Sequence, residues 1–251
     1  MKNHSLLFLL CFLFVSPQLW AQKTMVFSEA LPASQKVKLD LEYASNITIN
    51  IYDGQEVKLS VSASLNDNED NDNYEIEAKK EGDYLLFESR IKDLKKISKK
   101  RVALSGDNQG GHHWNRRVYW DDDHEVHIVN GNYLTLDVNY EISLPAQASL
   151  IIETVTGEIE MTSPPKGLEI KSVTGDIDLS VGEGAAHSFK VKTITGDVYT
   201  NLKLNYKEKD GKGLKRVGGG FSTRLEADLN GGGNAFVLES TTGNIYLRKQ
   251  E

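Results

Sequence analysis

The sequence predicts an all-β protein, a single-chain β-solenoid (β-helix) of stacked short strands with a hairpin or loop insertion. One six-residue phrase occurs four times in the second half of the 251-residue chain, at 154–159, 172–177, 193–198 and 240–245. Apolar and polar residues alternate around each copy, which is typical of strands that bury one face and leave the other in water. A single unit leaves its apolar face and its backbone donors without partners, and parallel stacking of the copies supplies both.

Residues 1–21 have the features of a secretory signal peptide. Lys2 precedes an apolar run at 6–15, and Ala21 provides a small residue where cleavage is expected. The apolar run is shorter than the roughly 20 residues that cross a bilayer, and no later stretch qualifies, so we expect no transmembrane segment. The single cysteine, Cys11, lies in this leader, so the mature chain is expected to contain no disulfide.

Residues 22–251 are expected to form one solenoid domain, whose first part also alternates. Turn signals such as Asp53-Gly54 separate the alternating stretches and predict hairpins. Residues 90–131 break the alternation with a basic run and a cluster of His, Trp and Asp, so we expect an insertion there. The stretches expected to form strands ahead of the repeats are 37–43, 47–51, 57–63, 74–78, 84–86 and 134–144.

Each copy of the repeat is expected to form a strand, a corner and a second strand. Superposed copies give four apolar columns, which we expect to face the core. Between the second and third columns the alternation slips by one residue, which indicates a bend. A Thr-Gly pair follows this corner in every copy, where glycine permits positive φ and close backbone approach. The third column, placed just after the corner, consists of Val155, Val173, Ile194 and Thr241.

The interval between the third and fourth copies is much longer than the intervals between the earlier ones. Turn signals lie within it, including glycine triplets at 218–220 and 231–233. We therefore expect a hairpin excursion at 201–233, after which the chain returns to the stack.

Three passages of the chain resemble the "putative adhesin" family of bacterial envelope proteins. They are Ile47 to Val61, Tyr140 to Ile159 and Leu229 to Leu247. The resemblance spans most of the chain after the leader except 90–131. It implies a β-solenoid with an adhesin-like or scaffold role, and it implies no particular chemistry.

One polar residue follows each repeated glycine, and together they would form a column along the stack: Glu158, Asp176, Asp197 and Asn244. Neighbours in this column would lie about 4.8 Å apart if the copies stack in register. Such a column could bind a cation or act as the acidic cleft of a polysaccharide-cleaving enzyme, whereas short polar side chains after glycine also commonly bond the backbone of a turn. Tyr199 and Tyr246 would stack beside the column and could carry carbohydrate. These six residues are the expected ligand face.

A metal site is the other chemistry considered. His112, His113, His124 and His127 lie close together in the insertion, and imidazoles on one loop can converge on zinc or copper. Their spacing matches no metal signature, and we favour a solvated insertion with incidental histidines over a metal site. No metal and no cofactor are therefore assigned.

The sequence favours a protein without catalytic activity. Its net charge of −7 gives no electrostatic support to a nucleic-acid partner. Nucleophile-elbow, P-loop and dinucleotide-binding motifs are absent from the sequence. We expect an exported binding or scaffold protein of a bacterial envelope, periplasmic, secreted or on the cell surface, with an envelope protein or a glycan as partner. The alternatives are a β-helix enzyme acting on polysaccharide and a metal-binding envelope protein.

Overall fold

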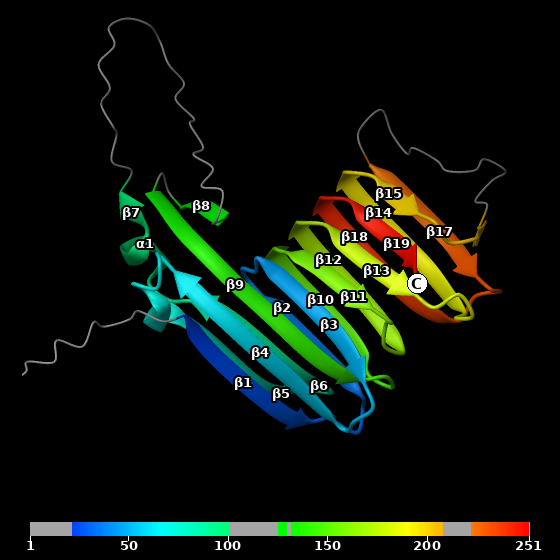
Figure 1. The fold of residues 1–251 in the computed structure, drawn as a ribbon, viewed down its shortest axis with the longest axis horizontal. Coiled ribbons are helices and arrows are strands. Elements are labelled where there is room, and N and C mark those ends of the chain that lie inside the picture. The colour runs from blue at the N-terminus through cyan, green and yellow to red at the C-terminus, as the bar shows by residue number, and fades with distance from the viewer. Residues whose placement is uncertain (1–21, 101–124, 130–131, 208–221, 251) are drawn as a thin grey trace, which may run out of the picture.

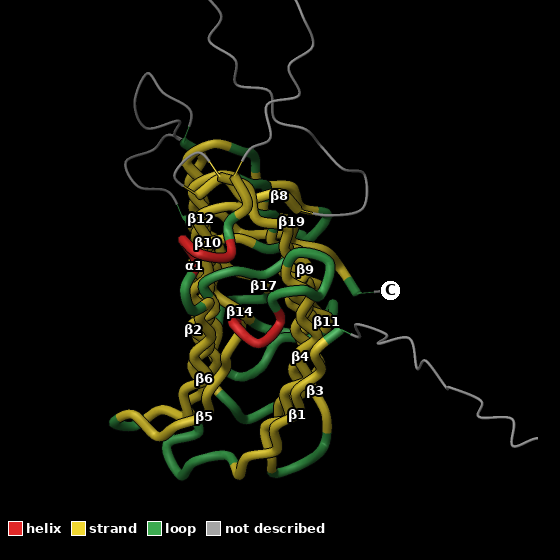
Figure 2. Tube along the Cα trace, turned by 90° about the vertical axis from the view of Figure 1, so that its left-hand side faces the viewer, coloured by secondary structure: helices red, strands yellow, loops and turns green. Residues whose placement is uncertain are grey.

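The computed structural model describes residues 22–100, 125–129, 132–207 and 222–250, and most of these residues lie in strands. Two sheets lie face to face with one apolar cluster between them (Figure 2). The helices described are a single turn each, η1 (Asn71–Asn73) and α1 (Leu94–Ile97). The prediction of an all-β protein is confirmed.

The larger sheet, which we call sheet A, has ten strands, and sheet B has nine (Figure 1). The order in sheet A is β1 (Lys23–Ala30), β4 (Glu56–Leu65), β9 (Asn132–Pro145), β3 (Asn46–Tyr52), β11 (Glu158–Thr162), β13 (Ile177–Val181), β19 (Ile245–Lys249) and β15 (Val198–Thr200), with β7 (Lys99–Lys100) and β8 (Glu125–Val129) also paired to β9. The order in sheet B is β16 (Leu204–Tyr206), β17 (Thr223–Leu229), β14 (His187–Thr195), β18 (Asn234–Thr242), β12 (Gly167–Thr174), β10 (Ser149–Thr156), β2 (Lys36–Leu41), β6 (Tyr84–Ile91) and β5 (Tyr74–Glu81).

Both sheets are mixed and open. The strands of the repeats pair in parallel, whereas β1 with β4, β5 with β6 and β14 with β17 pair antiparallel. Sheet A has edges at β1 and β15, and sheet B has edges at β16 and β5. In the described residues both sheets therefore have free edges and neither closes on itself.

Each copy of the repeat contributes one strand to each sheet, but the copies do not stack in chain order. β18 lies between β12 and β14, and β19 lies between β13 and β15. The fourth copy is therefore inserted between the second and the third. Before this return, the chain adds β16 and β17 to sheet B beyond β14, with antiparallel pairing.

The corner of each copy requires glycine. Gly157, Gly175, Gly196 and Gly243 all have positive φ, between 127° and 148°. A Cβ on Gly175 would lie 2.1 Å from the carbonyl oxygen of Gly157, and a Cβ on Gly243 would lie 2.1 Å from that of Gly175. Neighbouring corners thus approach so closely that no side chain fits between their backbones.

A buried hydroxyl explains the slip in alternation at the corner. Thr154, Ser172, Thr193 and Ser240 are each at most 7 % exposed. Their hydroxyls donate to backbone carbonyls, for example Thr154 Oγ1 to Thr156 O at 2.6 Å and Thr193 Oγ1 to Gly243 O at 2.8 Å. The inward position at the corner is therefore polar and satisfied.

The third apolar column does not face the core, contrary to the prediction. Val155, Val173 and Ile194 are 42 %, 48 % and 42 % exposed. Because the hydroxyl residue just before each of them points inward, the next side chain must point outward. The other columns are buried as predicted except at Val198, which is only partly buried; Leu150, Ile152 and Ile159 are all at most 1 % exposed.

Replacement of Gly175 by alanine tests the corner directly. The change adds a Cβ in conflict with a backbone carbonyl and forces a non-glycine residue to positive φ, so we expect unfolding free energy to fall by about 2 kcal/mol or more. Gly184→Ala is the matched control, because a Cβ there meets no atom within 4 Å and its φ is not positive. Equal denaturant midpoints for the two variants would contradict this account of the corner.

His187 should make stability depend on pH. Its ring stacks on Phe236 with centroids 4.2 Å apart, and its Nδ1 is buried without a hydrogen-bond partner among the described residues. Burial lowers the pKa of this imidazole, so the unfolded chain takes up a proton first as pH falls, and stability declines below the unfolded pKa. We expect His187→Phe to gain stability relative to wild type on going from pH 7.5 to pH 5. A difference independent of pH would show that His187 binds a proton equally well in the folded and unfolded states, and would contradict this account.

Candidate functional site

The column of polar residues after the repeated glycines runs along one margin of sheet A. Backbone hydrogen bonds place its members in the order Glu158, Asp176, Asn244 and Asp197. Asn244 therefore separates the two aspartates, because the fourth copy lies between the second and third. Only Glu158 and Asp176 are adjacent acidic residues.

Members of the column bond the backbone of their neighbours. The Asn244 amide donates to Asp176 Oδ1 at 2.7 Å, and the Asp197 amide donates to Asn244 Oδ1 at 3.0 Å. The side-chain amide of Asn244 also lies 3.5 Å from Asp176 Oδ2. These contacts join adjacent corners, so this part of the column has a structural role whatever else it binds.

A second row of side chains lies further along the same strands of sheet A. Tyr246 stacks on Tyr199, with ring centroids 5.2 Å apart and planes within 14°. Arg248 lies over the Tyr246 ring at 4.7 Å, and its Nε donates to both carboxylate oxygens of Asp178 at 2.9 and 2.7 Å. We call Tyr199, Tyr246, Asp178 and Arg248 the tyrosine face.

A groove of about 550 Å³ crosses the corner ends of the sheet B strands. The exposed third column forms one part of its lining. Charged residues from β2, β6, β10, β12, β14 and β18, with Glu42 just after β2, form another. The charged side chains are Asp40, Glu42, Glu88, Arg90, Glu153, Lys171, Lys192 and Glu239. Sequence reasoning missed this groove because it placed the third column inside, although the polar residues just before each corner were visible in the repeat.

Two of the five carboxylates that line the groove, Glu88 and Glu153, are held in the charged form by lysines. Lys38 Nζ lies 2.7 Å from Glu153 Oε2, and this hydrogen bond holds the pKa of Glu153 below its usual value. The hydrogen bond with Lys79 likewise lowers the pKa of Glu88. Glu42 differs, because burial raises its pKa. A raised pKa is a property of general acids, so Glu42 is the described groove residue best suited to proton transfer.

The histidine candidates receive no structural support. His112, His113 and His124 lie outside the described residues, and the side chain of His127 on β8 is not described. Across the residues that the structure describes, no three His, Cys, Asp or Glu side chains come together in a way that could hold a metal ion. Neither η1 nor α1, the helices in the described part of the chain, is long and apolar enough to cross a membrane.

Comparison with known proteins adds little. No protein-family model matches the chain, and no curated protein sequence is significantly similar to it. A crystal structure of a "putative cell adhesion protein" from Clostridium sporogenes aligns with 91 % of this chain and 100 % of its own length, with a TM-score of 0.49 and 13 % identity. A similarity this distant supports no statement about function.

Substitution of Asp176 tests whether the polar column is structural. Asp176→Ala leaves the Asn244 amide without its acceptor, which we expect to cost about 1 kcal/mol of unfolding free energy, whereas Asp176→Asn keeps an acceptor and should cost less. Glu158→Ala is the control, since Glu158 occupies the same column with an exposed side chain. Chemical denaturation of the three variants would contradict the assignment if Asp176→Ala and Glu158→Ala were equally stable.

Proposed function

We propose that the chain is an exported, non-catalytic β-solenoid of the bacterial cell envelope, an adhesin-like or scaffold protein that binds glycan through the tyrosine face. The observation that carries the proposal is the stacked pair Tyr199 and Tyr246 beside the ion pair of Arg248 and Asp178. The parallel strand-corner-strand units and the leader-like segment at 1–21 support the solenoid and the export.

The tyrosine face has the two kinds of group that a sugar needs. The apolar C–H face of a pyranose packs on an aromatic ring, while its hydroxyls bond to charged side chains. Tyr199 belongs to β15, the edge strand of sheet A, so no further strand within the described part of the chain extends that sheet past its ring. Its side chain is half exposed, at 50 %.

Neighbouring contacts already order this face. Tyr246 packs between Tyr199 and the guanidinium of Arg248, and Arg248 is itself fixed by Asp178. Binding therefore costs little side-chain entropy, because the rotamers are selected before a ligand arrives. An ordered aromatic pair with one ring half exposed is suited to a binding surface.

A polysaccharide-cleaving enzyme is the second candidate, and Glu42 is the observation in its favour. Its raised pKa and its place in the groove suit a general acid. The other groove carboxylates with resolved shifts, Glu88 and Glu153, are held charged by lysines. The two candidate functions depend on different residues. Polysaccharide cleavage would depend on Glu42, and glycan binding would depend on Tyr199.

Tyr199→Ala should weaken glycan binding. Loss of the outer ring removes a stacking surface worth on the order of 1 kcal/mol or more, so we expect affinity to fall about tenfold. The measurement is binding of the purified protein to immobilised envelope and extracellular polysaccharides, followed by titration against the best ligand. Tyr206→Ala is the matched control, because Tyr206 is 49 % exposed but lies on β16 of sheet B. Equal losses for both variants, or binding to no glycan, would refute the proposal.

A further inference from the structure

Among the described residues, no strand pairs with the outer edge of β1 in sheet A, and this leaves backbone groups unpaired in a regular pattern. Leu31 donates its amide to the carbonyl of Gln55, which lies directly opposite in the β1–β4 register. Hydrogen-bonded and non-hydrogen-bonded pairs alternate in an antiparallel ladder, so the odd-numbered residues of β1 bond to β4. The amides and carbonyls of Thr24, Val26 and Ser28 therefore point away from the sheet.

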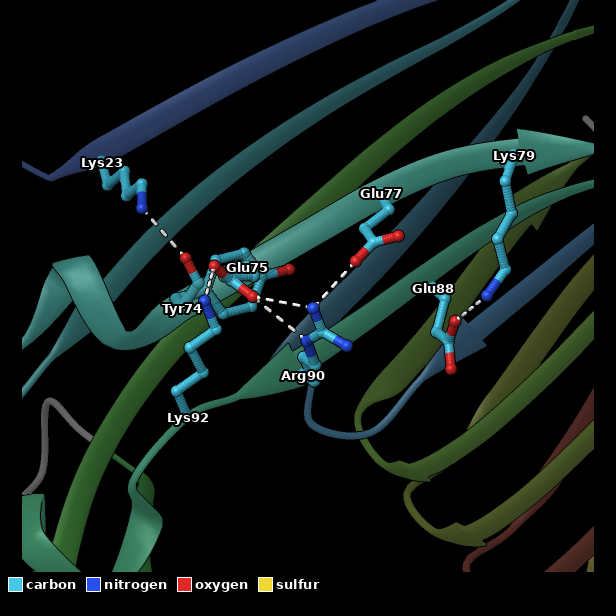
Figure 3. Close-up of polar contacts among 8 residues, drawn as sticks. All are labelled: Lys23, Tyr74, Glu75, Glu77, Lys79, Glu88, Arg90 and Lys92. Carbon is cyan, nitrogen blue, oxygen red and sulfur yellow. Dashed lines mark hydrogen bonds and ion pairs between the residues drawn. The ribbon is translucent and has the colours of Figure 1, made fainter.

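This edge lacks the protection found at the edge of sheet B nearest to it. On β5, Glu75 and Glu77 pair with Arg90 of β6, and charged side chains of this kind discourage strand pairing (Figure 3). The outward side chains of β1 are short or apolar, and Val26 is 73 % exposed. Strands with such edges commonly pair with another chain.

Sheet A also extends further than sheet B at this end. Counted outward from β3, sheet A continues through β9, β4 and β1, whereas sheet B continues from β2 through β6 and β5 only. β2 and β3 belong to one strand-corner-strand unit, so sheet A has one strand more than sheet B on this side of the unit. Its inner side chains Met25 and Phe27 are only partly buried against the core.

We propose that two copies of the chain associate by antiparallel pairing of β1 with β1 about a two-fold axis at Val26. This register matches the free groups, because Val26 opposes itself and Thr24 opposes Ser28 as hydrogen-bonded pairs. It also places Met25 opposite Phe27 on the inner side, where both side chains are only partly buried in the single chain.

Charge complementarity between the two copies of β1 favours the same pairing register. Pairing centred on Val26 sets Lys23 of one copy opposite Glu29 of the other, twice in the dimer. Lys23 is already ordered, since its Nζ donates to the carbonyl of Tyr74 at 2.9 Å (Figure 3). Glu29 is exposed, and its carboxylate has no hydrogen-bond or ion-pair partner among the described residues. A shift of the centre by one residue would lose both charge pairs.

The dimer would join two sheets A into one continuous sheet with a tyrosine face at each far end. Two binding faces on one particle raise the apparent affinity for a polymer through effective concentration. The association itself rests only on β1 and does not depend on what the tyrosine face binds.

Cross-linking at the proposed axis gives a direct test. In a Cys11→Ser background of the full chain, Val26→Cys introduces the only cysteine. Opposed residues in a hydrogen-bonded pair have Cα atoms about 5.5 Å apart, which a disulfide can span. Ser28→Cys is the control on the same side of the same strand, since the two copies of residue 28 would lie roughly 13 Å apart. Oxidation should link the Val26→Cys protein into dimers and leave the Ser28→Cys protein largely monomeric.

Sedimentation of the otherwise unmodified chain provides the second measurement. We expect a concentration-dependent dimer, and at least about tenfold weaker association for Val26→Pro, which removes an outward amide without breaking a β1–β4 hydrogen bond. Val155→Lys, a change at an exposed valine far from β1, should leave association unchanged. A wild-type protein that stays monomeric, a dimer insensitive to Val26→Pro, or equal cross-linking at positions 26 and 28 would each overturn the proposal.

Discussion

The close approach of neighbouring glycine corners is the constraint on which the rest of the structure depends. At Gly175 and Gly243, a Cβ would come within 2.1 Å of the next corner's carbonyl oxygen. Each corner joins a strand of sheet B to a strand of sheet A, so fixing the corners fixes the register of both sheets at once. The buried hydroxyls three residues before each glycine satisfy the backbone at the bend and turn the next side chain outward.

Much of this arrangement follows from the repeat. The alternation predicts which side chains of each strand are buried, and the invariant Thr-Gly pair predicts the corner. The order in which the copies stack cannot be predicted from the repeat, because four nearly equivalent units pair equally well in several orders. The long interval between the third and fourth copies also allows the chain to return into the stack. The exposure of Val155 was missed for a different reason: at a slip of one residue, alternation alone does not show which of two adjacent side chains enters the core.

Binding and folding use different rows of the same face. The residues that follow the glycines, such as Asp176 and Asn244, bond adjacent corners to each other. The next outward row holds Tyr199 and Tyr246. These two residues occupy equivalent positions in the repeat, which predicted that they are neighbours. Their partners Arg248 and Asp178 could not be paired from the sequence, because the contact joins the second copy to the fourth and depends on the stacking order.

Disulfide trapping within one chain tests the stacking order most directly. Cysteine pairs would be introduced in a Cys11→Ser background at Asp178 with Tyr246, which are register partners on β13 and β19, or at Asp178 with Tyr199, which are separated by β19. The account predicts rapid intramolecular oxidation of the first pair and little of the second. Preferential oxidation of the Asp178 and Tyr199 pair would show that the copies stack in chain order and would contradict the central claim.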